Sequence, residues 1–232
     1  MNPMIILLLI LSVIIGVLLG KFFGNRQKLA KSLLIVSAGF LITICLNEVF
    51  PQVYHSEDHN IGIWVIAGVV LQMILENLTK GFEHGHFHHH SEKGILPVAL
   101  IVGLFIHAFI EGIPLADETD VMSPYLQGIL IHNLPISFIM GAFLFQHKKF
   151  SAYSWLIILI FALASPLGVW LGQYFDPSYK PYFLAVVGGI FLHISSVIIF
   201  ESSKNHNIDW HKIGFVILGV LLAMFGHAFH IH

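Results

Sequence analysis

Long apolar runs alternate with short polar connections along the whole chain. A helix needs roughly 20 mostly apolar residues to cross the hydrocarbon core of a bilayer. Eight runs approach that length, at about Met4–Lys21, Ser32–Val49, Ile61–Leu78, Ile95–Ala116, Tyr125–Gln146, Tyr153–Tyr174, Tyr182–Phe200 and Ile213–Ala228. The pattern predicts an all-α polytopic membrane protein with eight transmembrane helices, which form a single transmembrane domain over residues 1–232.

Short motifs recur between the two ends of the chain at an offset of 150 to 152 residues. Ile15–Gly20 resembles Leu167–Gly172, and Gly68–Leu71 resembles Gly219–Leu222. The offset pairs spans one to three with spans six to eight, and the two triplets enter the membrane from opposite sides. Inverted repeats of this kind are typical of transporters. The alternative is chance similarity, because Gly-x-x-x-Gly is a common packing motif of membrane helices.

Composition and charge agree with a membrane protein and give it an orientation. Of the residues, 56% are hydrophobic and 10% are charged, and the mean hydropathy is +0.83. Soluble domains carry about 25% charged residues. Every Lys and Arg except Lys180 falls at the connections after spans one, three, five and seven. Because cytoplasmic connections carry the basic excess, we expect both termini outside a plasma (inner) membrane and the His-rich connection, about residues 82–93, in the cytoplasm.

Two strings within spans four and five place ionisable side chains at membrane depth: His107–Gly112 (HAFIEG) and His132–Pro135 (HNLP). His107 and Glu111 are four residues apart and share one helix face. Ionisable groups at this depth face a protected interior and mark ion pathways. Imidazole and carboxylate groups together bind divalent metals such as Zn²⁺. We therefore predict a metal site between spans four and five, with His107, Glu111 and His132 as ligands.

The other acids near the apolar runs are expected at span ends. They are Glu48, Glu76 and Glu201. This leaves Glu111 as the one acid placed well inside a span. The single Cys45 excludes an internal disulfide and a cysteine-based zinc site.

The order of these motifs resembles the ZIP (Zrt/Irt-like protein) family of divalent metal transporters. His107-x-x-x-Glu111-Gly112 resembles the family's fourth-span motif, His132-Asn133-x-Pro135 its fifth-span motif, and Ser165–Gly168 its Glu-Pro-x-Gly in span six. The resemblance implies a 3+2+3 arrangement of eight spans. It also implies transport of a divalent metal, Zn²⁺ before Fe²⁺, Mn²⁺, Co²⁺ or Cd²⁺, into the cytoplasm, with no cofactor and no enzymatic activity.

The chain departs from the family pattern at positions that build the family's two-metal centre. Family members commonly carry Asn or acidic groups where this sequence has Ala108, Asn133, Ile136 and Ser165. The resemblance therefore implies a reduced ligand set in which Asn133 joins the two histidines and Glu111, with Ser137 one turn further on. We infer one metal site in place of two.

Other histidines are candidate accessory metal ligands. They are His193 in span seven and, in the His-rich connection, His84, His86, His88, His89 and His90. For the connection the alternative is a solvated linker, and for His193 it is a hydrogen-bonded packing role.

Two other classes of function stay open. One is a metal-binding membrane sensor or a non-transporting ZIP-like protein, which the missing acids favour. The other is an intramembrane zinc hydrolase, although the chain lacks the His-Glu-x-x-His motif. The expected partners are the metal ion and the lipid bilayer, without nucleic acid. The sequence leaves a homodimer open.

Overall fold

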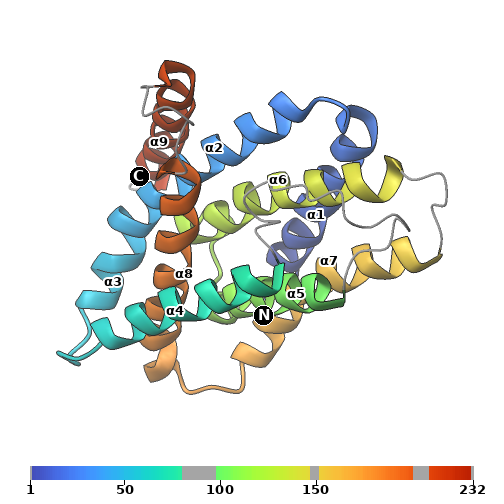
Figure 1. The fold of residues 1–232 in the computed structure, drawn as a ribbon. Coiled ribbons are helices and arrows are strands. Elements are labelled where there is room, and N and C mark those ends of the chain that lie inside the picture. The colour runs from blue at the N-terminus through green and yellow to red at the C-terminus, as the bar shows by residue number, and fades with distance from the viewer. Residues whose placement is uncertain (1, 80–97, 147–151, 201–208, 231–232) are drawn as a thin grey trace.

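The computed structural model describes residues 2–79, 98–146, 152–200 and 209–230, with α9 side chains described as far as Gly226. These ranges are helical and contain no strand. The long helices, shown in Figure 1, are α1 (Pro3–Phe23), α2 (Gln27–Ile44), α4 (Gly62–Thr79), α5 (Val98–Gly112), α6 (Pro124–Gln146), α7 (Ala152–Gly172), α8 (Lys180–Phe200) and α9 (Trp210–His230). Shorter pieces are a π-helical turn at Cys45–Val49, α3 (Phe50–Tyr54) and 3₁₀ turns at Ile113–Leu115 and Pro177–Tyr179.

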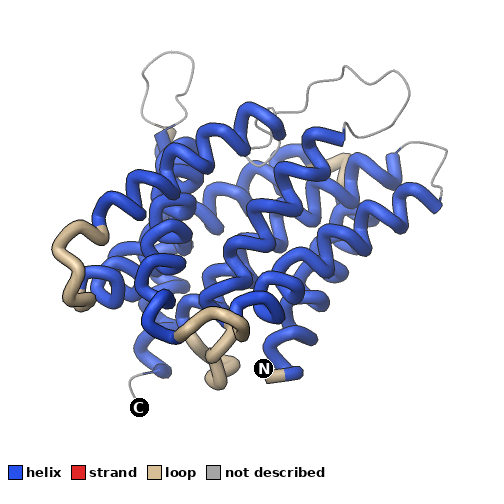
Figure 2. Tube along the Cα trace, turned by 90° about the horizontal axis from the view of Figure 1, so that it is seen from below, coloured by secondary structure: helices blue, strands red, loops and turns tan. Residues whose placement is uncertain are grey.

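The described helices confirm an all-helical, multi-pass architecture. Seven helical segments of the described ranges are long and apolar enough to cross a bilayer, and Trp210–Gly226 forms a shorter apolar helix. Figure 2 shows the N-terminal end of α1 and the C-terminal end of α9 at the same face of the bundle.

The second apolar segment is longer than the sequence indicates. It is helical from Gln27 to Tyr54, because a π-helical turn joins α2 to α3. Within that turn the Phe50 N–H donates to the Cys45 carbonyl, five residues back. Such turns insert one extra residue into a helix and occur often at functional sites. The helix therefore continues beyond Glu48, to Tyr54.

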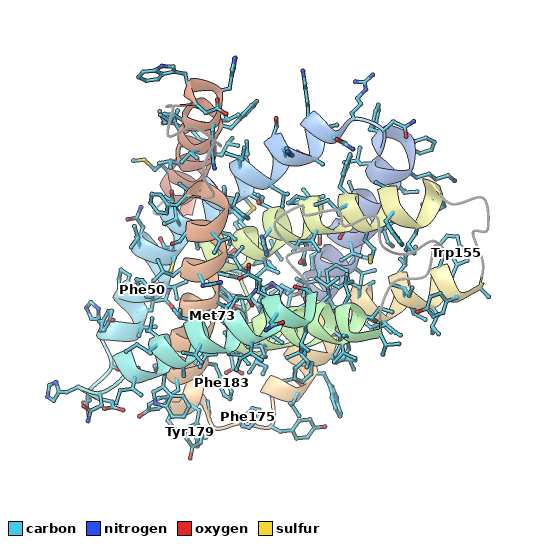
Figure 3. The ribbon with its side chains drawn as sticks, in the orientation of Figure 1. Phe50, Met73, Trp155, Phe175, Tyr179 and Phe183 are labelled. Atoms are coloured by element: carbon cyan, nitrogen blue, oxygen red, sulfur yellow. The ribbon has the colours of Figure 1, made fainter. Side chains whose placement is uncertain are left out.

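Apolar side chains cover the outside of the bundle, as a lipid-facing surface requires. Figure 3 labels Met73 on α4 and Trp155 on α7, whose side chains are 54% and 60% exposed. At the connection between α7 and α8, Phe175, Tyr179 and Phe183 lie close together (Figure 3). Aromatic groups are enriched where a membrane meets water, so this cluster fits one edge of the bilayer.

Asp176 caps the start of that connection. Its carboxylate accepts a hydrogen bond from the backbone N–H of Ser178 at 2.9 Å. This bond, together with the Ser178 hydroxyl, lowers the pKa of the Asp176 carboxyl. The hydrogen bonds of the turn therefore stabilise the ionised form of Asp176.

Facing glycines bring two pairs of helices into backbone contact. A Cβ atom at Gly68 of α4 would collide with the backbone of Val186 on α8, and one at Gly189 would collide with the backbone of Val65 and Val69. The pair α2 and α9 is joined in the same way at Gly39 and Gly219. Small residues at membrane helix interfaces allow this close approach.

We expect Gly68→Ala to lower the free energy of unfolding by about 1–3 kcal/mol, the usual cost of overpacking. The measurement is denaturant unfolding in detergent. Gly214→Ala is the matched control, because nothing lies within 4 Å of its added Cβ atom. It should be neutral, or stabilising by about 0.5–1 kcal/mol from helix propensity. Equal destabilisation by the two substitutions would contradict this account of the packing.

Candidate metal centre

The candidate ligands of α5 lie on the buried stripe of that helix. Leu100, Leu104, His107 and Glu111 follow one another at helical spacing and are all buried. Val102, on another face, is 44% exposed. The helix therefore turns its apolar face to the outside and its two ionisable groups to the interior, which is the arrangement that membrane insertion requires.

His107, Glu111 and His132 converge in the interior from α5 and α6. Each offers one ligand atom, and these atoms all lie within 4.8 Å of one another. The two imidazole ring centroids are 5.6 Å apart. The exposed fraction is 1% for His107 and 0% for Glu111 and His132. The structure thus brings together, out of reach of bulk water, the three side chains that the sequence proposed as ligands.

The contact between His107 and Glu111 needs a positive charge. Nε2 of His107 and Oε1 of Glu111 are 2.9 Å apart. Neither carboxylate oxygen of Glu111 accepts a hydrogen bond from the described residues. Two acceptor atoms at this distance repel each other unless a proton or a metal ion lies with them. Adjacent ligands of tetrahedral Zn²⁺ lie about 3.4 Å apart, from bonds of about 2.1 Å, so small side-chain movements would admit an ion.

Gln72 of α4 orients His107, a role that the sequence analysis missed. Its Oε1 atom lies 3.2 Å from Nδ1 of His107, and its side chain is fully buried. An amide oxygen can only accept, so Nδ1 carries the proton. In a neutral imidazole with its proton on Nδ1, the lone pair of Nε2 faces Glu111, where a metal ion would bind. Histidine ligands commonly have such a hydrogen-bond partner on the other ring nitrogen.

Asn133 and Ser137 are also buried on α6. Their exposed fractions are 2% and 0%. Asn133 Oδ1 and Ser137 Oγ form no hydrogen bond with the described residues. Buried oxygen atoms without a partner are costly, which agrees with a role for these two side chains towards an ion or water in the interior.

Tyr125 links the start of α6 to the end of α5. Its hydroxyl donates a hydrogen bond of 2.8 Å to the backbone carbonyl of Glu111. Tyr125 also lines an opening together with Glu48, Glu118 and Lys180. Tyr125 therefore lies between the backbone of Glu111 and a space lined by charged side chains.

The positions at which the chain departs from the ZIP pattern are buried as well. The exposed fraction is 1% for Ala108, 0% for Ile136 and 3% for Ser165. Larger acidic groups at these positions would thus point into protein and not into lipid.

Of the histidines predicted as accessory metal ligands, only His193 lies within the described residues. Nε2 of His193 lies 2.8 Å from Oε2 of Glu76, so His193 is hydrogen-bonded to an acid on another helix. The histidines of the His-rich connection, His84 to His90, and the acid Glu201 lie outside the described residues.

The chemistry of the centre is that of a cation site. A buried carboxylate without donors is strongly disfavoured as an anion unless a cation accompanies it. Two imidazoles and one carboxylate are a common ligand set for Zn²⁺, with a fourth position left for water or another ligand.

A comparison with protein families also points to a metal ion as the ligand. A family model described as ZIP zinc transporter matches residues 83–231, well over half of the chain. The chain belongs to the ZIP zinc transporter family. No curated protein sequence matches it at a significant level. The family match covers α5 to α9 and so includes all three converging side chains, whereas Gln72 lies outside it. ZIP membership makes the chain a multi-pass membrane protein of a metal transport family.

Gln72→Ala should weaken Zn²⁺ binding about 10- to 100-fold, the usual effect of removing the partner of a ligating histidine. Gln72→Glu keeps an acceptor for the Nδ1 proton and should retain most of the affinity. Isothermal titration of detergent-solubilised protein, with the histidines of the His-rich connection replaced by Ser, checks both. Unchanged affinity in Gln72→Ala would contradict the orienting role.

Proposed function

We propose that this ZIP protein carries divalent metal ions, Zn²⁺ first among them, across the plasma (inner) membrane into the cytoplasm. Fe²⁺, Mn²⁺, Co²⁺ and Cd²⁺ are alternative cargoes, because geometry and availability set selectivity more than raw affinity does. The cargo is a substrate, and the proposal requires no cofactor.

The observation that carries the proposal is the convergence of His107, Glu111 and His132 within 4.8 Å in the interior of a membrane bundle. Such a group is expensive unless it serves an ion. Asn133 is proposed as a further ligand and Ser137 as an accessory one, since both are buried with an oxygen available. The histidines from His84 to His90 are proposed as weak metal collectors.

An eight-span, 3+2+3 arrangement is part of the proposal. In this arrangement the inverted repeat relates α1 to α7, α2 to α8, α4 to α9 and α5 to α6. The observed helix contacts support it, because α1 packs on α6 as α7 packs on α5, and α2 packs on α9 as α8 packs on α4. The two ends of the described chain lie at one face (Figure 2), which agrees with an even number of spans and with both termini outside.

We also propose that the centre holds one metal ion and not two. The chain lacks the family's second set of acids, and the corresponding positions Ala108 and Ile136 carry apolar groups. The same loss supports the rival function of a metal sensor that binds without transport. A homodimer remains compatible with all of these readings.

The decisive test is metal flux. In sealed proteoliposomes we expect Zn²⁺ uptake by the parent and loss to the level of empty liposomes for His107→Ala, Glu111→Ala and His132→Ala. Each removes a ligand that no neighbour replaces. His59→Ala, an exposed histidine, is the control and should transport normally.

Transport at the parental rate by Glu111→Ala would show that the proposed site is wrong. Tight Zn²⁺ binding by the parent without flux would favour the sensor. Metal-dependent turnover of a lipid or peptide would favour the hydrolase.

The lost acids can be restored. With the His-rich connection neutralised, we expect one tight intramembrane metal in the parent. The variant restores a polar or acidic group at each departure: Ala108→Asn, Asn133→Asp, Ile136→Glu and Ser165→Glu. It should bind two metals. Metal-free, it should be less stable, and metal at 100 times Kd should recover about 2.7 kcal/mol. Metal stoichiometry checks this, and two tight metals in the parent would refute the single-site reading.

A further inference from the structure

Positive charge gathers where α1 turns into α2. We call the four side chains that carry it the basic turn: Lys21, Arg26, Lys28 and Lys31, all of them exposed. The first 47 residues of the chain contain no other basic residue and no Asp or Glu. Within the described part of the chain, no carboxylate forms an ion pair with any of the four. The charge of the basic turn is therefore available to an anion from outside the bundle.

Aromatic rings fix the position of two of these charges. Nζ of Lys21 lies 5.6 Å from the ring centroid of Phe22 and 5.0 Å from that of Phe145 on α6. The guanidinium carbon of Arg26 lies 5.5 Å from the ring centroid of Phe23. A ring face attracts a cation but carries no net charge. The rings thus position the two cations without neutralising them.

The basic turn lies at one end of the bundle, against α6. A Cβ atom at Gly24 would collide with Ala142 of α6, and Figure 1 shows the turn beside the C-terminal end of that helix. The N-terminal end of α1 lies at the face that it shares with the end of α9 (Figure 2). The basic turn, at the other end of α1, therefore lies at the opposite face, which is the cytoplasmic one in the proposed orientation.

An exposed apolar strip runs along α1 from the basic turn towards the middle of the bundle. Its members are exposed and follow one another at spacings of three or four residues: Leu11, Ile15, Leu18 and Phe22. At 1.5 Å per residue the strip is about 16 Å long, which is half of the roughly 30 Å hydrocarbon core. The strip ends at Phe22, whose ring lies under the Lys21 cation. A fixed cluster of positive charge thus continues into an apolar surface one leaflet deep.

Orientation of the chain in the membrane is the competing explanation for the basic turn. Basic residues beside a span set its orientation by their charge, and that role requires neither a fixed position nor an adjoining strip. A soluble anion would use the charges but not the strip. An amphiphile with an anionic head and an acyl chain matches both parts of the surface.

We propose that the basic turn and the apolar strip bind one anionic phospholipid of the adjacent leaflet. Its phosphate and headgroup lie at the four cations, and an acyl chain lies along Leu11 to Phe22. Basic clusters beside membrane helices attract anionic lipids, and Lys and Arg form strong charge-assisted hydrogen bonds with phosphate. The turn joins α1, which packs on α6, to α2, which packs on α9. Lipid that binds to the folded bundle also stabilises it.

Native mass spectrometry of the detergent-solubilised protein, titrated with dioleoylphosphatidylglycerol (PG) or dioleoylphosphatidylcholine (PC), tests the proposal. We expect the parent to bind its first PG at least tenfold more tightly than PC. Lys21→Gln/Arg26→Gln/Lys28→Gln/Lys31→Gln should bind PG no more tightly than PC. The variant Lys21→Arg/Arg26→Lys/Lys28→Arg/Lys31→Arg keeps all four charges and should keep the preference for PG.

Lys28→Gln/Lys31→Gln keeps the test decisive if the fourfold neutral variant fails to fold, because it leaves both ring contacts intact. It should weaken PG binding by about 25-fold, about fivefold for each charge removed. The matched control is Lys180→Gln, which removes a basic group at the start of α8 and should leave PG binding unchanged. Inorganic phosphate at the same concentration should not displace PG.

A preference for PG that persists in both neutral variants would overturn the proposal. An equal loss in Lys180→Gln would overturn it as well, because the effect would then be one of net charge. Displacement of PG by inorganic phosphate would show a site for soluble anions instead of a lipid site.

Discussion

The carboxylate of Glu111 is the constraint on which the rest of the structure depends. It is completely buried and accepts no hydrogen bond from the described residues, and the Nε2 atom of His107 lies 2.9 Å from it. An anion in such surroundings is stable only with a cation. The inward stripe of α5, the second imidazole from α6 and the hydrogen bond from His107 to Gln72 all make sense as the means of holding that cation. In the proposed function, that cation is the metal ion that the protein carries.

Close helix packing keeps the centre dry. Gly168 of α7 approaches the backbone of Phe109 on α5, and Gly16 of α1 approaches Leu134 on α6, so each ligand helix has a neighbour in direct contact. These contacts leave no room for side chains between the paired helices, and the burial of the three ligands strengthens the electrostatic attraction between ligand and ion. Gly16 and Gly168 occupy corresponding positions in the two similar motifs of the sequence, Ile15–Gly20 and Leu167–Gly172.

Much of this could be predicted from the sequence, and the failures have physical causes. Apolar length predicts the spans, and the spacing of His107 and Glu111 predicts a shared face. The π-helical turn was missed because the apolar run ends near Val49, whereas a hydrogen bond from Phe50 to Cys45, five residues back, carries the helix on to Tyr54. Gln72 was missed because an uncharged amide gives little signal, and its partner is 35 residues away on another helix. The pair of Glu76 and His193, 117 residues apart, likewise depends on the tertiary packing of α4 against α8.

The most direct test of the central claim is X-ray absorption spectroscopy of Zn²⁺ bound at one equivalent to the protein with a His-free connection. The account predicts a shell of nitrogen and oxygen at about 2.0–2.1 Å, with the multiple scattering of two imidazoles and no sulfur. The imidazole signal should fall by half in His132→Ala. A shell of oxygen alone, or a sulfur ligand from Cys45, would contradict the account.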